Sequence, residues 1–349
     1  MNSTQIIALF FCASIIVLVF FDVIKREKVE KINFFSKEQT DWLRGIAILL
    51  VMHSHYFADE NLYVFSGVPR QLLSSIGFLG VGLFVFMSGY ATMISYNTKP
   101  DYLKYYIPKR LLRLYIPFLI AYVVFVIIML FYGKQLSLND FLGLPIMSLP
   151  RTLNWYLKVQ LGLYIVFYLV AKIFKKSRTI IFALFLVCAA FMIVGNITKI
   201  SNFWFESSYL FPLGMLFAFY RDGIFDVLSK RKIFSFFLSS FVLFITYILY
   251  YFLGGLFCEI IFTFGFVQFL TTICIYFKGK SNVLKFLGVL SIDLYLSHIV
   301  YSNTIMIYYN VGGSIISYVL FIVCSMGIGL VIHNMSKLII GAITRKTII

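Results

Sequence analysis

Apolar runs of about 20 residues recur along the whole chain, each long enough to cross the roughly 30 Å hydrocarbon core of a bilayer as an α-helix. Hydrophobic residues make up 61% of the 349 residues and charged residues only 13%. This balance excludes a water-soluble domain of ordinary composition. The stretches between the runs are too short to form a separate globular domain. The sequence therefore predicts an all-α, polytopic transmembrane bundle with the lipid bilayer around it.

Eleven spans are expected from the positions of these runs, a ten-span core preceded by one N-terminal helix. The first helix is predicted to stay as a signal anchor, because no basic residue precedes it and KREKVEK follows it. We expect residues 1–40 to form this anchor and a basic linker, and residues 41–349 to form one membrane domain. The expected spans are 6–24, 45–58, 72–96, 114–131, 155–171, 179–196, 203–220, 233–253, 255–277, 284–309 and 314–335.

Lysine and arginine are distributed unequally between the two sides of the predicted bundle. The segments that follow the odd-numbered spans hold 25 of the 30 basic residues, and the other side holds five. Because cytoplasmic loops carry the excess of positive charge, we expect an outside N-terminus and a cytoplasmic C-terminus in a bacterial plasma membrane. This topology accounts for most of the formal charge of +16. No nucleic-acid partner is expected, since the charges are spread over six short loops.

The cysteines are isolated, odd in number and placed within apolar runs. This pattern is typical of small core residues, and neither a disulfide framework nor a metal site is expected from it. The five are Cys12, Cys188, Cys258, Cys274 and Cys324.

The second predicted helix carries ionisable residues on one face, in the stretch DWLRGIAILLVMHSHYF. At about 100° and 1.5 Å per residue, Arg44 and His55 point the same way within roughly 20° and lie about 16 Å apart along the axis. Asp41 lies near this stripe, Asp59 can meet His55 as an i, i+4 neighbour, and His53 falls on the opposite face. Ionisable groups at membrane depth are candidates for function. The alternative is that Arg44 is an inner-leaflet anchor and His55 a packing residue.

A second basic group stands at the cytoplasmic start of the fourth predicted helix, in YYIPKRLLRLYIPF. Arg110 and Arg113 share a helix face, with Lys109 beside them. Paired guanidinium groups suit a phosphate or diphosphate. The distribution of positive charge in cytoplasmic loops explains the same residues equally well.

Two further helices carry polar or small residues. The third, GFLGVGLFVFMSGY, has glycines at spacings that favour close helix packing, with Ser88 as a polar candidate. The tenth contains LSIDLYLSHIV, in which Asp293 and His298 diverge by about 140° around the helix and are not expected to touch. His298 could face the same cavity as His55, whereas His333 in the last span is interpreted as structural.

Five of these segments, in the same order, resemble the acyltransferase-3 family of integral membrane acyltransferases. Arg44 and His55 are similar to its Arg-x10-His signature, and Arg110 and Arg113 to its Arg-x-x-Arg motif. GVGLFVFMSGY, NWYLKVQL at 154–161 and SIDLYLSH at 291–298 resemble three further family segments. Ten spans from residue 45 onward also agree with the family. Gly82 departs from it, since many members carry aspartate there, and Asp59 is our candidate for the missing acid.

The resemblance implies transfer of an acyl group, usually acetyl from acetyl-CoA on the cytoplasmic side, to a hydroxyl group of a cell-surface glycan or its lipid-linked precursor. It implies no tightly bound cofactor and no metal. Since the chain leaves no room for a fused esterase-like domain, we expect it to acylate its acceptor directly or to pass the group to a separate protein. Polysaccharide-assembly proteins are further candidate partners.

The same resemblance, combined with the residue pattern, suggests a role for each candidate. Arg44, Arg110 and Arg113 would hold the phosphates of acyl-CoA, whose pantetheine arm is comparable in length to the Arg44–His55 separation. His55, with Asp59 and His298, forms the catalytic group, His55 acting as a base near neutral pH or carrying the acyl group. The outer connections would recognise the sugar, with Tyr63, Phe65 and Trp155 as aromatic contacts.

Two other classes remain open. A transporter or flippase for a lipid-linked sugar would also be polytopic, with Glu206, Glu259 and Asp293 on its path, and would move substrate without acyl-CoA. A structural partner in a polysaccharide-assembly complex would tolerate loss of His55. Only the enzyme predicts release of CoA.

Overall fold

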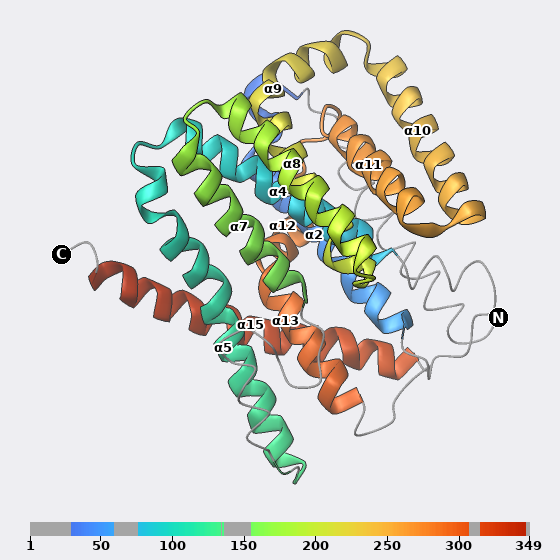
Figure 1. Cartoon of the computed structure of the whole chain (residues 1–349). Helices are drawn as coiled ribbons and strands as arrows, with labels where there is room; N and C mark the ends of the chain where they lie inside the picture. Colours follow the sequence, from blue (N-terminus) through green and yellow to red (C-terminus); the bar gives the residue numbers. More distant parts are fainter. Residues whose placement is uncertain (1–28, 59–75, 134, 136–154, 307–314, 347–349) are drawn as a thin grey trace.

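A computed structural model of the protein describes residues 29–58, 76–133, 135, 155–306 and 315–346. Within these ranges the chain is helical and contains no β-strand, which confirms the predicted all-α class (Figure 1). The helices are α2 (Lys37–Ala58), α4 (Gly77–Thr98), α5 (Tyr106–Phe131), α7 (Trp155–Ile173), α8 (Ser177–Ile197), α9 (Leu210–Lys230), α10 (Lys232–Leu253), α11 (Gly255–Ile273), α12 (Asn282–Val289), α13 (Ser291–Tyr301) and α15 (Ile315–Lys346). Short 3-10 turns lie at Lys31–Asn33, Tyr102–Tyr105 and Asn202–Trp204, and a π turn at Ser302–Met306.

Seven helical segments among the described residues are long and apolar enough to cross a membrane, and the pair α12 and α13 would make an eighth. The expected span 6–24 lies outside the described residues. Neither α2 nor α9 is among the seven. The charged residues of α2 lie in its first turns, with two histidines near its end, and α9 carries charged residues in its second half. Both helices instead pack extensively on α4 inside the bundle.

The expected single helix over 284–309 is wrong. The chain bends by 73° between α12 and α13, and Leu290 lies between the two helices. α12 packs along α2, whereas α13 turns away to pack on α15. The two helices thus pack against different neighbours. Gly288, a weak helix former, lies just before the bend.

Three glycine contacts set the spacing between the core helices. A Cβ on Gly214 of α9 would lie 2.0 Å from the backbone oxygen of Phe86 in α4, so these two helices touch backbone to backbone. A Cβ on Gly288 of α12 would lie 1.8 Å from the oxygen of Asp41 in α2. The close packing predicted for the glycines of the third helix is confirmed, since a Cβ on Gly89 would lie 1.9 Å from the oxygen of Phe211.

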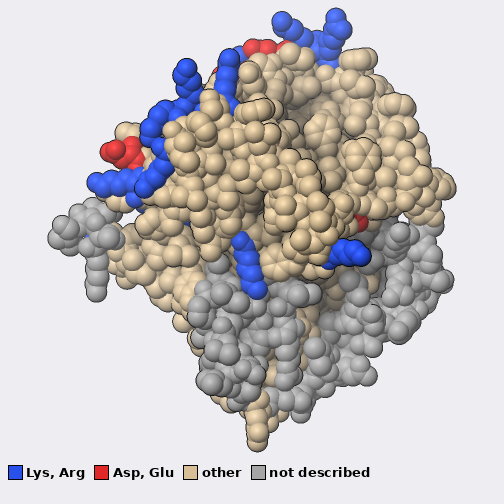
Figure 2. Space-filling view, in the orientation of Figure 1, with Lys and Arg blue, Asp and Glu red and all other residues tan. Residues whose placement is uncertain are grey.

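The outer helices leave apolar side chains uncovered, as expected for lipid-facing surfaces. α10 lies at the edge of the bundle against α11 (Figure 1), and most of its residues are exposed or half-buried. The described cysteines Cys188, Cys258 and Cys274 are free and buried, and Cys324 is free and half-buried, as predicted. Cys12 lies outside the described residues. Figure 2 shows lysine and arginine side chains gathered mainly along the upper and left edges of the molecule, with few elsewhere on this face.

Candidate functional site

Two histidines from distant parts of the sequence meet at the C-terminal end of α2. Nδ1 of His55 lies 2.6 Å from Nε2 of His298 on α13, and Nδ1 of His298 lies 2.9 Å from the backbone oxygen of Leu294. A carbonyl oxygen only accepts, so Nδ1 of His298 carries its hydrogen and Nε2 presents a lone pair. With both rings neutral, His55 then donates from Nδ1, and its own Nε2 is left with a lone pair.

The surroundings of the two rings differ. His298 is completely buried, whereas His55 is exposed. Their planes stack at 18°, with the centroids 4.9 Å apart, and Tyr295 approaches His298 edge-on at 5.6 Å. The buried ring therefore orients the exposed one, whose Nε2 has the chemistry of a general base.

The N-terminal part of α2 contains an ion pair. Nη1 of Arg44 lies 3.0 Å from Oδ1 of Asp41, as the one-face prediction for these residues requires. Asp41 is buried and Arg44 half-buried. The carboxylate fixes the position of the guanidinium, which retains further N–H donors for an anion.

Arg44 lines two adjoining cavities, with volumes of about 380 and 340 Å³. Arg110 and Arg113 of α5 line both as well. The first cavity lies among α4, α5 and the end of α15 and also contacts Lys99 and Lys109. The second continues between α4, α7 and α13 as far as Tyr156 and Tyr295. The structure thus brings all three predicted arginines to the shared lining of two adjoining cavities.

The two arginines of α5 are held differently. Arg110 is half-buried and donates to Thr92 Oγ1 at 3.0 Å and to Tyr102 OH at 3.2 Å. Its guanidinium also lies 4.7 Å from the centre of the Tyr164 ring, within range of a cation–π interaction. Arg113 is exposed. Arg110 therefore supports the wall of the cavity, while Arg113 has the greater freedom to meet a ligand.

A polar chain lines the second cavity, and of its members the sequence predicted only Ser88 as a candidate. Gln160 donates from Nε2 to Ser88 Oγ at 2.8 Å, and Ser88 donates to Tyr164 OH at 2.9 Å. Tyr156, Gln160 and Tyr164 recur every four residues on α7, so they share one helix face. This polar repeat within an apolar span was the signal that could have found them.

The second cavity ends before it reaches the histidines. Tyr156 and Tyr295 close it, with ring centroids 5.3 Å apart. His298 follows Tyr295 by one turn of α13, about 4.5 Å along the axis. Neither His55 nor His298 lines the cavity. A tyrosine pair therefore separates the arginine-lined hollow from the candidate base.

Several predicted residues lie elsewhere. Asp59, Tyr63 and Phe65 fall outside the described residues, and Trp155 packs on Phe203 with centroids 5.3 Å apart. A side chain on Gly82 would point toward Thr263 and Leu210 and not into the arginine-lined cavities. An acid at this position would therefore not reach the donor side of the site from this geometry.

The remaining histidines connect α15 to the bundle. His333 pairs with the buried Asp293 at 2.8 Å, which agrees with the prediction that Asp293 does not touch His298. Nε2 of His53 lies 2.5 Å from Tyr318 OH, on the opposite side of α2 from His55. No group of three metal-ligating side chains occurs among the residues that the structure describes.

Comparison with protein families gives a match over most of the chain. The family model, described as an acyltransferase domain, matches residues 38–334, a range that contains every site residue named above. Comparison with curated proteins and with solved structures gave no significant match.

Proposed function

We propose a function for this chain, which belongs to the acyltransferase-3 family and matches its model over residues 38–334. It transfers an acetyl group from acetyl-CoA to a hydroxyl group of a cell-surface polysaccharide or its lipid-linked precursor. The observation that carries this proposal is an exposed, oriented imidazole beyond the end of an arginine-lined cavity.

The arginine-lined hollow suits the nucleotide end of the donor. Arg44, Arg113 and the edge of Arg110 present guanidinium groups, which bind phosphates through paired N–H donors. The second cavity leads from these arginines between α4, α7 and α13 as far as Tyr295, one helical turn before His298. The pantetheine arm would occupy it, spanning a distance on the order of the 16 Å helix rise from Arg44 to His55.

His55 would act as the general base. Its Nε2 takes the proton of the acceptor hydroxyl while the oxygen attacks the thioester carbonyl. The carbon–sulfur bond then breaks, and the CoA thiolate takes that proton from His55. Because Tyr156 and Tyr295 close the cavity in this structure, a side-chain rotation of one of them is required before the thioester can meet His55.

The acceptor would approach from the opposite side of the membrane to the arginines. Trp155 lies at the start of α7, at the end expected to face outward, and its half-buried ring offers an aromatic surface for a sugar. Asp59 remains a proposed helper of His55 as its i, i+4 neighbour.

The test is CoA release by the purified protein in liposomes supplied with acetyl-CoA and a panel of surface glycans. His55→Gln should lower turnover by roughly 10²- to 10⁴-fold, because the base is lost. Arg113→Gln should mainly raise the KM for acetyl-CoA, and Lys176→Gln, a charge loss at an exposed loop position away from both cavities, is its matched control.

Two results would contradict the proposal. Unchanged turnover in folded His55→Gln would remove the base from the mechanism. Movement of a lipid-linked sugar across the liposome membrane without any CoA release would assign the protein to the transporters instead.

A further inference from the structure

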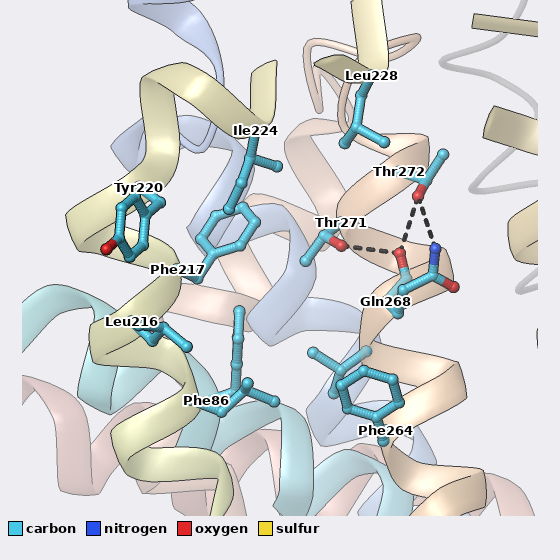
Figure 3. A pocket seen from close by; sticks show the side chains of 12 residues that line it. Phe86, Leu216, Phe217, Tyr220, Ile224, Leu228, Phe264, Gln268, Thr271 and Thr272 are labelled. Atoms are coloured by element: carbon cyan, nitrogen blue, oxygen red, sulfur yellow. Dashed lines mark hydrogen bonds between the residues drawn. The ribbon is translucent and has the colours of Figure 1, made fainter. Parts of the chain in front are cut away.

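A crevice separate from the arginine-lined cavities opens between α9 and α11. Both helices pack on α4, and the space left between them has a volume of about 430 Å³. Figure 3 shows Leu216, Phe217 and Ile224 of α9 facing Phe264 of α11 across it, with Phe86 of α4 at its base. It shares no lining residue with the arginine-lined cavities.

The crevice is open at the surface of the molecule. Tyr220 and Phe264, which line it, are 46% and 42% exposed. Along α11 it extends from Phe264 to Thr272, about 12 Å of helix rise. This depth is close to one leaflet of the hydrocarbon core, about 15 Å or half the core thickness. An acyl chain lying along the helices would therefore fit its length.

One end of the crevice is polar and leads to cations. Gln268, Thr271 and Thr272 line that end, and Gln268 and Leu228 also line a second hollow of about 350 Å³ at the α9–α10 connection. That hollow is lined further by Lys230 and Arg231, both exposed. Figure 2 shows basic side chains at this end of the molecule. The surface thus passes from apolar through polar to cationic.

We propose that this crevice binds an anionic phospholipid. An acyl chain lies between α9 and α11, the glycerol ester region meets the amide and hydroxyl groups, and the phosphate lies against Lys230 and Arg231. Ammonium and guanidinium groups attract anionic lipid headgroups, and the guanidinium can bind a phosphate through two donors. The order of the three zones matches the order of the chemical groups along a phospholipid. This site is independent of the proposed acetyl transfer.

The experiment measures lipid bound to the full chain. The protein is purified in a mild detergent, exchanged into mixed micelles with phosphatidylglycerol or phosphatidylcholine, and analysed by native mass spectrometry. Phosphatidylglycerol should remain bound to the wild type more tightly than phosphatidylcholine. The double variant Lys230→Gln, Arg231→Gln should weaken phosphatidylglycerol binding by roughly 10- to 30-fold, because it removes two positive charges that each attract the anionic headgroup about equally.

Controls separate the charge from the crevice. Lys175→Gln with Lys176→Gln removes two exposed charges from the loop between α7 and α8 and should leave binding unchanged. Leu216→Trp should fill the crevice and reduce binding of both lipids, with the melting temperature reporting that the variant is folded. Equal binding of the two lipids, or equal losses in the two charge variants, overturns the proposal. A lipid-free dimer overturns it as well, because the crevice would then belong to a second copy of the chain.

Discussion

The two ring nitrogens of His298 have different partners, and this difference gives His55 its direction. The backbone oxygen of Leu294 fixes a hydrogen on Nδ1, so that Nε2 can only accept from His55. His298 touches no reacting atom in this arrangement. In the proposed mechanism it is therefore a positioning residue, comparable to the outer partners that orient histidine ligands in metal sites.

Replacing His298 should therefore affect turnover and not donor binding. His298→Leu removes the acceptor for His55 Nδ1, and we expect kcat to fall by roughly 10- to 100-fold, the range seen when such partners are lost, with the KM for acetyl-CoA unchanged. His298→Gln, whose side-chain oxygen can accept the same hydrogen bond, should recover part of the rate. Steady-state kinetics on both variants measure this. An equal loss of kcat in His298→Leu and His298→Gln would show that the hydrogen bond accepted by Nε2 of His298 does not set the rate.

Sequence reasoning named both histidines as candidates and allowed His298 to face the same cavity as His55, but it could not predict that the two rings touch. The helical period alone placed Arg44 near Asp41 and His53 opposite His55, and the structure agrees. The contact of His55 with His298 spans 243 positions, and no local pattern encodes a contact of that range. The polar face of α7 was encoded locally, but it was hidden by the high apolar content around it.

Among the elements, the bent pair α12 and α13 connects the two ends of the site. α12 packs against the part of α2 that carries Asp41 and Arg44, and α13 supplies His298. Most residues across 284–309 are apolar and no proline interrupts them, so hydropathy predicts one helix. The bend comes from packing: Gly288 must stay against α2 while the next residues turn toward α15.

Gly288→Ala tests this contact. The added Cβ would meet the Asp41 oxygen at 1.8 Å, so α12 must move away from α2. We expect the free energy of unfolding to fall by about 1–3 kcal/mol, as is typical of overpacking. The KM for acetyl-CoA should rise, because Asp41 holds Arg44 in position. Thermal unfolding in detergent and steady-state kinetics measure the two effects.

The matched control is Gly223→Ala in α9, where an added Cβ meets nothing within 4 Å. This variant should keep the wild-type melting temperature or exceed it slightly, since alanine is the better helix former. If Gly288→Ala and Gly223→Ala had the same melting temperature and the same KM, the close approach of α12 to α2 would not contribute to stability or to donor binding.

At the scale of the whole molecule, the distribution of basic residues predicts the orientation in the membrane. We expect Lys199→Cys, in the exposed segment after α8, to react with a membrane-impermeant maleimide on intact cells. Lys176→Cys, in the exposed loop before α8, should react only after the membrane is permeabilised. The described native cysteines are largely buried, which keeps their background labelling low. The reverse pattern would invert the topology and place the arginine cavities outside.

The 243-residue separation between His55 and His298 also constrains how the protein is made. α2 carries charged and polar side chains and is not among the helices that are long and apolar enough to cross a membrane. Its partners α12 and α13 follow it by more than 200 residues in the sequence. Biosynthesis must therefore hold α2 without part of its packing until those two helices have been made. The helix that carries the candidate base thus reaches its final packing long after its own synthesis.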